Sequence, residues 1–356
     1  MKQTNPHRLA TLDSLRGIAA VSVVLFHLTL HQPDAPFHLT WGVTGVDLFF
    51  IISGFVILLT LQRTRSAQDF IIARFSRLYP VYWSAVTFTA LCMLLGSIWG
   101  YSDVSNDEYW ANMTMFQHYF GVRDLDESYW TLLVEMLFYG LMLLCFLAKQ
   151  LGNIEKIGCI AVLFQILVHT LLKQHLPTVC ESLHWGFPIL NHLQLFWAGI
   201  LFYKIFTEGQ TIARWIGLFV SFITTLLLFE QSGRSFLFIS FEGYLLTTTL
   251  YYVLFGLFVG GRLEWINNRV TLFFGAISYS LYVIHHYFLN GFQTILQQQW
   301  GWSFWPSAVF ALVSALIIAT FITNFIEKPA LKFIRSRYFK SSKAPEIVEQ
   351  YSKNSY

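Results

Sequence analysis

Charged residues are scarce in this chain of 356 residues: Asp, Glu, Lys and Arg together make up only 12%. A soluble domain carries about twice that fraction, so the composition excludes an ordinary water-soluble globular protein. Cysteine is also rare, and the four residues present form neither a disulfide framework nor a metal-binding spacing. The net charge of +3 is too small to indicate a nucleic-acid partner.

The chain is rich in long apolar segments. Hydrophobic residues make up 55% of the chain and aromatic residues 18%. Because an apolar run of about 20 residues can cross a bilayer as a helix, we expect an all-α polytopic membrane protein with about ten spans. The expected spans are 14–31, 43–62, 79–98, 129–148, 154–172, 188–207, 212–230, 240–260, 271–291 and 306–326. We expect residues 1–340 to form a single transmembrane domain and residues 341–356 a short, polar, disordered tail.

Basic residues predict the orientation in the membrane. One set of alternate loops, together with the two ends of the chain, holds most of the lysines and arginines. The other set holds mainly acids, such as Asp103 and Asp126. Because lysine and arginine are retained on the cytoplasmic side, both termini and the tail are predicted to be cytoplasmic.

Two ionisable residues lie inside the first apolar segment. His27 follows Arg16 by eleven positions, close to three helical turns, so both side chains leave the same helix face about 16 Å apart along the axis. Ionisable residues inside a bilayer are costly and usually mark a pathway or an active site. The structural alternative is that Arg16 extends to the inner headgroups and His27 bonds to a neighbouring helix.

A second group of charged residues is expected at the cytoplasmic surface. Arg74 and Arg77 are three positions apart and hence neighbours on a helical turn, and guanidinium groups match phosphate oxygens. Arginines at the end of a span also act as topology determinants that bind lipid headgroups. Glu327 favours an anion site, because a carboxylate at that depth can hold several arginines, Arg16 included, in position.

A third group is expected near the outer surface. Glu135 lies about 7 Å below the start of the fourth span, at the depth of His27. A carboxylate near an imidazole raises its basicity and fixes its tautomer, as a general base requires. Asp47 and His285 also lie in the outer halves of their spans and could join this group. The alternative for Glu135 is a buried acid that is hydrogen-bonded across helices.

Two aromatic residues on the fourth span have the right chemistry for a sugar. Trp130 could stack on a sugar ring, and the hydroxyl of Tyr139 could hydrogen-bond to one. Aromatic belts at membrane interfaces explain both residues about as well.

Six segments of the chain together resemble the acyltransferase-3 family of polytopic membrane acyltransferases. The segments are 12–19 (LDSLRGIA) with His27 on the same helix, 42–57 (GVTGVDLFFIISGFVI), 74–77 (RFSR), 130–139 (WTLLVEMLFY), 278–285 (SYSLYVIH) and 325–329 (FIEKP). They occur in order over nearly the whole chain. The second segment departs from the family pattern. It ends in SGFVI, whereas many members have another glycine first and a proline last, and this difference affects the backbone around Ser53.

The resemblance implies a membrane O-acyltransferase. Such an enzyme moves an acyl group, most often acetyl, from cytoplasmic acyl-CoA to a hydroxyl of a cell-surface or lipid-linked carbohydrate on the outer side. The implied catalytic residues are His27 as base and Glu135 as its support. The implied donor-binding residues are Arg16, Arg74, Arg77 and Glu327, and the residues expected to bind the acceptor or support the site are Asp13, Asp47, Trp130, Tyr139 and His285.

The same resemblance implies the partners and the location. Acyl-CoA is expected as a co-substrate, with no permanently bound cofactor and no metal, and the surroundings are the lipids of a bacterial cytoplasmic membrane. A two-step route through an acylated His27 or a nearby tyrosine stays open beside direct transfer. The competing functions are a transporter or flippase in which His27 and Glu135 relay protons, and a non-catalytic scaffold.

Overall fold

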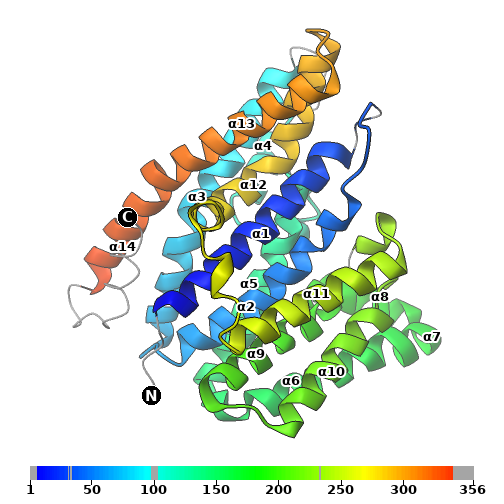
Figure 1. Ribbon diagram of the computed structural model, residues 1–356, viewed down its shortest axis with the longest axis vertical. Helices are drawn as coiled ribbons and strands as arrows, with labels where there is room; N and C mark the ends of the chain where they lie inside the picture. The colour runs from blue at the N-terminus through cyan, green and yellow to red at the C-terminus, as the bar shows by residue number, and fades with distance from the viewer. Residues whose placement is uncertain (1–5, 31, 33, 98–102, 232–233, 340–356) are drawn as a thin grey trace. The chain divides into compact units, whose positions relative to one another are not determined.

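The computed structural model describes residues 6–30, 32, 34–97, 103–231 and 234–339. All regular secondary structure in these residues is helical, which confirms the all-α prediction (Figure 1). The α-helices are α1 (Pro6–Leu30), α2 (Gly45–Leu61), α3 (Ala67–Ser97), α4 (Asn106–Asn112), α5 (Trp130–Leu147), α6 (Ile154–Leu167), α7 (Lys173–His175), α8 (Pro177–Gly186), α9 (Leu193–Glu208), α10 (Ile212–Leu227), α11 (Phe241–Val259), α12 (Arg269–Gln298), α13 (Phe304–Ile322) and α14 (Lys328–Phe339).

Shorter helical turns connect several of these helices. The 3₁₀ turns are Thr40–Thr44, Gln117–Phe120, Glu127–Tyr129, Leu151–Asn153, Pro188–Asn191, Ser235–Leu237 and Glu264–Ile266. Two π-helical turns, Val168–Leu172 and Thr323–Glu327, follow α6 and α13.

Within the described residues, eight helices are long and apolar enough to cross a membrane, so the chain is a multi-pass membrane protein. The other two expected spans, 188–207 and 212–230, are α9 and α10, with 16 residues each. In α9 every residue from Gln194 to Lys204 is buried, so this segment is apolar because protein surrounds it. Helix α3 begins at Ala67, well before the expected start at 79, and continues through Pro80.

The helices group into two compact units. The first unit lies within residues 1–64 and 129–275, and the second within residues 65–128 and 276–356, so α12 begins in one and ends in the other. The single transmembrane domain expected over residues 1–340 stays a prediction. The expected tail, 341–356, lies outside the described residues.

In the first unit, α2 and α9 pack closely along their lengths. Gly54 of α2 lies against the backbone of Phe196, and Gly199 of α9 lies against the backbone of Ile51, so a Cβ atom at either glycine would overlap the other helix. Small residues let membrane helices approach until their backbones touch, which increases the van der Waals contact that holds them together. This contact positions Ser53, the residue next to Gly54, which belongs to the candidate site.

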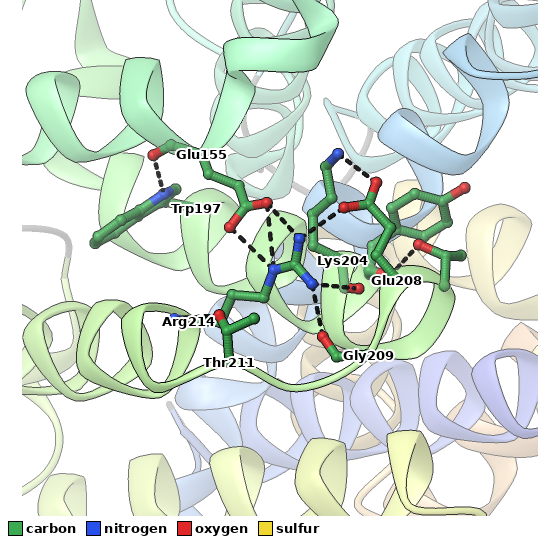
Figure 2. Close-up of polar contacts among 9 residues, drawn as sticks. Glu155, Trp197, Lys204, Glu208, Gly209, Thr211 and Arg214 are labelled. Atoms are coloured by element: carbon green, nitrogen blue, oxygen red, sulfur yellow. Dashed lines mark hydrogen bonds and ion pairs between the residues drawn. The ribbon is translucent and has the colours of Figure 1, made fainter.

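A network of four charged side chains joins α6, α9 and α10 at one end of the first unit (Figure 2). The buried Arg214 guanidinium donates to both carboxylate oxygens of Glu155, and its Nη2 donates to Glu208 at 2.6 Å. Its Nη1 donates to the carbonyl of Gly209 at 2.6 Å, where α9 ends. Lys204 donates to the second oxygen of Glu208 at 2.6 Å. Two cations and two anions therefore hold three helices together at the α9–α10 turn.

Replacing Arg214 with alanine should lower the stability of the protein, because the two carboxylates would lose their shared cation. Losing one partner of a buried pair costs about 3–5 kcal/mol, and partial exposure of Glu155 and Glu208 should reduce this to about 2 kcal/mol. The thermal midpoint in detergent should fall by about 5 °C. The same change at the exposed Arg262 should leave it unchanged, and equal shifts for the two variants would contradict a structural role for the network.

The second unit is built from α3, the main part of α12, α13 and α14. The Tyr279 hydroxyl donates to the backbone carbonyl of Leu78 at 3.0 Å, which joins α12 to α3. Gln297 donates to the Ser307 hydroxyl at 2.9 Å, which joins α12 to α13. Helix α14 also packs against α3. Two elements of the candidate site, the start of α3 and the turn after α13, thus belong to one packed unit.

Candidate functional site

Helix α1 carries both His27 and Arg16 without a break, as the spacing predicts (Figure 1). The half-buried His27 ring contacts the backbone carbonyl of Val23 through Nδ1 at 3.0 Å. Only an N–H group can donate to a carbonyl, so Nδ1 carries the hydrogen and the neutral ring has its lone pair on Nε2. This tautomer is the one in which Nε2 can accept a proton.

The opposite end of α1 is anchored within the first unit. The Ser14 hydroxyl donates to the Asn267 side-chain carbonyl at 3.0 Å and lies 3.2 Å from the Thr271 hydroxyl. Nearby, Arg16 donates from Nη1 to Asp13, one helical turn before it, at 3.3 Å. Asp13 therefore orients the Arg16 guanidinium and balances part of its charge, so the structure links two residues that the family resemblance implicates separately.

The start of α2 packs against α1 close to His27. Gly42, in the 3₁₀ turn that precedes α2, lies against the backbone of Ser22. A Cβ atom added at Gly42 would lie only 2.9 Å from the Cβ atom of Phe26. A larger side chain there would push the turn away from α1. Asp47, in the first turn of α2, is buried and has the hydroxyl of Tyr244 as a hydrogen-bond partner. Asp47 is thus bound to α11, and its expected association with His27 stays a prediction.

Glu135 on α5 accepts two hydrogen bonds on one oxygen. The hydroxyl of Tyr139, one helical turn further on, donates to Oε1 at 2.6 Å, and the hydroxyl of Ser53 on α2 donates to the same atom at 2.9 Å. Two of the three expected residues of α5, Glu135 and Tyr139, are therefore in contact, and Ser53 is an addition that the sequence did not indicate. The pairing of Glu135 with His27 stays a prediction.

Trp130, the first residue of α5, belongs to an aromatic cluster in the first unit. Its ring lies 5.5 Å from the His192 ring and 6.4 Å from the Phe50 ring, between centroids. The guanidinium carbon of Arg234 lies 5.8 Å from the Trp130 ring centroid. A half-exposed tryptophan beside an imidazole and a cation has groups that can stack on a sugar and hydrogen-bond to its hydroxyls. His192 and Arg234 have no motif of their own, so the sequence did not indicate them.

The second unit contains the other expected donor residues. Arg74 and Arg77 lie three apart on α3, half-buried, and Arg74 lies 5.9 Å from the Phe70 ring centroid. Glu327 lies in the π-helical turn after α13, which packs against α3. Its Oε2 accepts from the Ser280 hydroxyl at 3.4 Å. The arginine-bearing helix and the carboxylate-bearing turn are thus in contact, and the pairing of Glu327 with the arginines stays a prediction.

His285 is completely buried on α12, and a loop from the same unit reaches it. Its Nδ1 donates to the backbone carbonyl of Tyr282 at 2.6 Å. Asp126, also completely buried, accepts from the backbone N–H of Tyr287 at 2.9 Å and interacts electrostatically with His285. The Ser128 hydroxyl donates to Asp126 at 2.6 Å and lies 3.2 Å from the backbone carbonyl of Tyr282. The sequence placed Asp126 among the acids of an outer loop, but the structure buries it against α12.

The loop that supplies Asp126 has its own scaffold. Helix α4 begins with a capping box in which Ser105 and Glu108 hydrogen-bond to one another's backbone N–H groups. Arg123 donates to Glu108 at 2.6 Å and lowers the pKa of that carboxyl, so the pair stays ionised at neutral pH. Asn112 accepts from the backbone N–H of Leu125 at 3.0 Å, next to Asp126. These contacts hold the buried carboxylate in place.

The two units therefore carry different chemistry. The first contains an imidazole with a defined tautomer, a carboxylate held by two hydroxyls, and an aromatic cluster that suits a sugar. The second contains an arginine pair with a carboxylate-bearing turn, and a buried acid–imidazole group. A general base and an anion-binding group are the parts that acyl transfer from a phosphorylated thioester needs.

Comparison with known proteins relates the chain to acyltransferases. Residues 9–324 match the model of the acyltransferase-3 family, which is described as an acyltransferase domain. A putative acetyltransferase of Acidianus two-tailed virus is 25% identical over 77% of this chain and 81% of the viral protein. The peptidoglycan O-acetyltransferase OatA of Listeria monocytogenes is 26% identical over 39% of this chain. Protein 2 in the picA locus of Rhizobium radiobacter is 36% identical over 25% of this chain.

Several of these relatives are matched over only part of their length. The chain spans 48% of the Rhizobium radiobacter protein and 25% of the Listeria monocytogenes enzyme. No solved structure matches the chain.

Proposed function

Because the chain belongs to the acyltransferase-3 family, we propose that it is a membrane O-acetyltransferase that moves an acetyl group from acetyl-CoA to a carbohydrate hydroxyl. The donor binds on the cytoplasmic side and the acceptor on the outer side of the membrane. The observation that carries the proposal is the His27 imidazole, which is held through Nδ1 on a membrane helix with its lone pair on Nε2. The name of the Listeria monocytogenes relative, a peptidoglycan O-acetyltransferase, supports a glycan as the acceptor.

His27 acts as the general base in this proposal. Its Nε2 takes the proton from the acceptor hydroxyl while the oxygen attacks the thioester carbonyl. The carbon–sulfur bond then breaks, the thiolate of coenzyme A leaves with the bonding electrons, and His27 returns the proton to it. The product is an O-acetyl ester, and no serine or cysteine nucleophile is required. General base catalysis of this kind contributes about 10²–10⁴-fold to the rate.

Glu135 and the aromatic cluster serve the acceptor side. The hydrogen bonds from Ser53 and Tyr139 hold the Glu135 carboxylate in one orientation, in which it stabilises the imidazolium that forms on His27. Trp130 stacks on the acceptor sugar. Asp47 and His285 are assigned supporting roles.

Arg74 and Arg77 bind the phosphates of coenzyme A. Their guanidinium groups leave adjacent positions of α3, and phosphate oxygens match such groups in charge and geometry. Glu327, on the turn that packs against α3, keeps these side chains extended by charge attraction. Arg16, oriented by Asp13, is also assigned to donor binding. The distribution of lysines and arginines supports a cytoplasmic position for this group.

Changing Arg74 or Arg77 to alanine should weaken the binding of acetyl-CoA by at least about tenfold, because each loses a charge-assisted hydrogen bond to phosphate. Raising the ionic strength should weaken binding further in the wild type. Equilibrium binding of labelled acetyl-CoA to purified protein in detergent measures both effects. Arg337→Ala, an exposed change of equal charge on α14, should bind normally. Unchanged affinity in a folded double variant would assign the two arginines to lipid headgroups instead.

The proposed function as a whole is tested by acetyl transfer in the purified protein. Labelled acetyl-CoA and a soluble oligosaccharide should yield a base-labile acetyl ester on the sugar, in proportion to the amount of protein. Binding of acetyl-CoA with no ester formed on any glycan acceptor, and no release of coenzyme A, would contradict it.

A further inference from the structure

A pair of histidines outside the candidate site joins α8 to the end of α6. Helix α8 packs against the π-helical turn Val168–Leu172, which follows α6 in the first unit (Figure 1). The turn carries His169 and α8 carries His184. A π turn inserts one residue into a helix at a cost in stability, and such turns occur frequently at functional sites. Here the turn places a fully buried imidazole opposite α8.

The two imidazoles face each other through the same ring atom. The Nε2 atom of His184 lies 3.3 Å from the Nε2 atom of His169, and the ring centroids are 4.6 Å apart. At 3.3 Å the separation exceeds the usual length of an N–H hydrogen bond, about 2.9–3.0 Å. Direct hydrogen bonding between the rings is therefore weak at this geometry.

The tautomer of His184 follows from its second nitrogen. Its Nδ1 lies 2.7 Å from the backbone carbonyl of Cys180, one turn earlier in α8, so Nδ1 carries the hydrogen. The neutral His184 ring therefore directs a lone pair from Nε2 toward His169. A histidine that binds a metal almost always donates its other ring N–H to a carbonyl or carboxylate in this way, which fixes the ring and raises its basicity as a ligand.

From this geometry we propose that His169 and His184 form a binding site for a divalent transition metal ion of the zinc type. Two nitrogens bound to one tetrahedral zinc ion at about 2.05 Å lie about 3.3 Å apart, the separation found between the two Nε2 atoms. Imidazole is a preferred ligand of zinc, copper and nickel, whereas calcium and magnesium prefer oxygen. The separation of the two Nε2 atoms therefore suits the ion.

The remaining coordination positions belong to water. The described part of the chain contains no group of three or more histidine, cysteine or carboxylate side chains placed to hold a metal. His184 is half-buried, so solvent can reach the ion from its side. The Cys180 thiol lies near Nδ1 of His184 at 3.4 Å and donates to the Val168 carbonyl. The contact with Val168 joins α8 to the π-helical turn.

A bound ion would connect α8 to the π-helical turn and would add positive charge close to the aromatic cluster. His169 interacts electrostatically with His192, whose ring contacts Trp130. The site therefore lies beside the group to which acceptor binding is assigned, but its existence does not depend on the proposed acetyl transfer.

The test is zinc binding by chelator-treated, full-length protein in detergent. Micromolar Zn²⁺ should raise the thermal midpoint of the wild type, whereas Mg²⁺ at the same concentration should not, since binding to the folded state stabilises it. His184→Gln and His169→Gln should each raise the dissociation constant for Zn²⁺ at least about tenfold, because one of two protein ligands is lost. His175→Gln, an exposed change six residues from His169, should bind as the wild type does.

Equal zinc affinity in the wild type and in both glutamine variants would overturn the proposal, as would the absence of any zinc effect. A second measurement, made on the wild type, tests the proposal even if a variant fails to fold. X-ray absorption by the zinc-loaded wild type should show two imidazole ligands at about 2.0 Å, with oxygen filling the other positions. Any other number of imidazoles would also overturn the assignment.

Discussion

Replacing His27 with alanine should abolish acetyl transfer while leaving the binding of acetyl-CoA intact. The proposed base is lost, so the rate should fall by about 10²–10⁴-fold, to the background of the assay. The donor phosphates are assigned to Arg74 and Arg77 on α3, far from His27 in the sequence and on another helix. Turnover and equilibrium donor binding, measured on the same purified sample, separate the two steps.

The chain offers a matched control for this variant. His38 also binds a backbone carbonyl of α1 through Nδ1, that of Thr29 at 2.7 Å, but it is exposed and has no assigned role. His38→Ala should therefore turn over at close to the wild-type rate. Near-normal turnover in folded His27→Ala protein would contradict the mechanism, and a transport function would then become the leading explanation.

Changing Glu135 to glutamine should lower the turnover number by about 10-fold to 100-fold and leave the Michaelis constant for acetyl-CoA unchanged. An amide keeps the shape of the side chain but removes the charge that stabilises an imidazolium, which matters in the transition state rather than in donor binding. Steady-state kinetics with acetyl-CoA as the varied substrate measures both constants.

The neighbours of Glu135 provide graded variants. Tyr139→Phe and Ser53→Ala each remove one of the two hydrogen bonds to Oε1, so each should have a smaller effect than Glu135→Gln. If Glu135 were only a structural acid, Glu135→Gln would reduce the thermal midpoint and leave the turnover number of the folded protein unchanged. That outcome would remove Glu135 from the mechanism.

The helices could be predicted from the sequence where membrane spans are long and apolar. Eight of the expected spans coincide with helices able to cross a membrane. Helix α9 resembles a span in sequence because burial by neighbouring helices produces the same apolar composition as burial by lipid. Helix α10 also has only 16 residues, but it keeps large apolar side chains such as Ile216 and Phe219 exposed, so burial by protein does not explain its composition. The start of α3 was placed too late because Arg74, Arg77 and Pro80 interrupt the apolar run without ending the helix.

The residues of the candidate site also fall into those that the sequence indicates and those that it does not. Residues with a costly charge inside a span, such as His27 and Glu135, could be identified because their burial requires a reason. Ser53 and Asp126 could not, since a serine in an apolar helix and an acid in an outer loop are ordinary in sequence. Their roles arise from contacts with α5 and α12, which only the folded chain brings near them. His192 and Arg234 likewise become candidates only through their contacts with Trp130.

The central claim is that this protein transfers acetyl groups across a membrane from a cytoplasmic thioester to an outer hydroxyl. The most direct test uses sealed vesicles that contain the purified protein in one orientation, established by protease accessibility of its ends. Labelled acetyl-CoA is supplied only to the side that carries both termini, and an impermeant oligosaccharide only to the other side. The account predicts acetyl ester on the oligosaccharide and none in vesicles that carry His27→Ala. Ester that forms only when both substrates share one side, or equal yields from the two proteins, would contradict it.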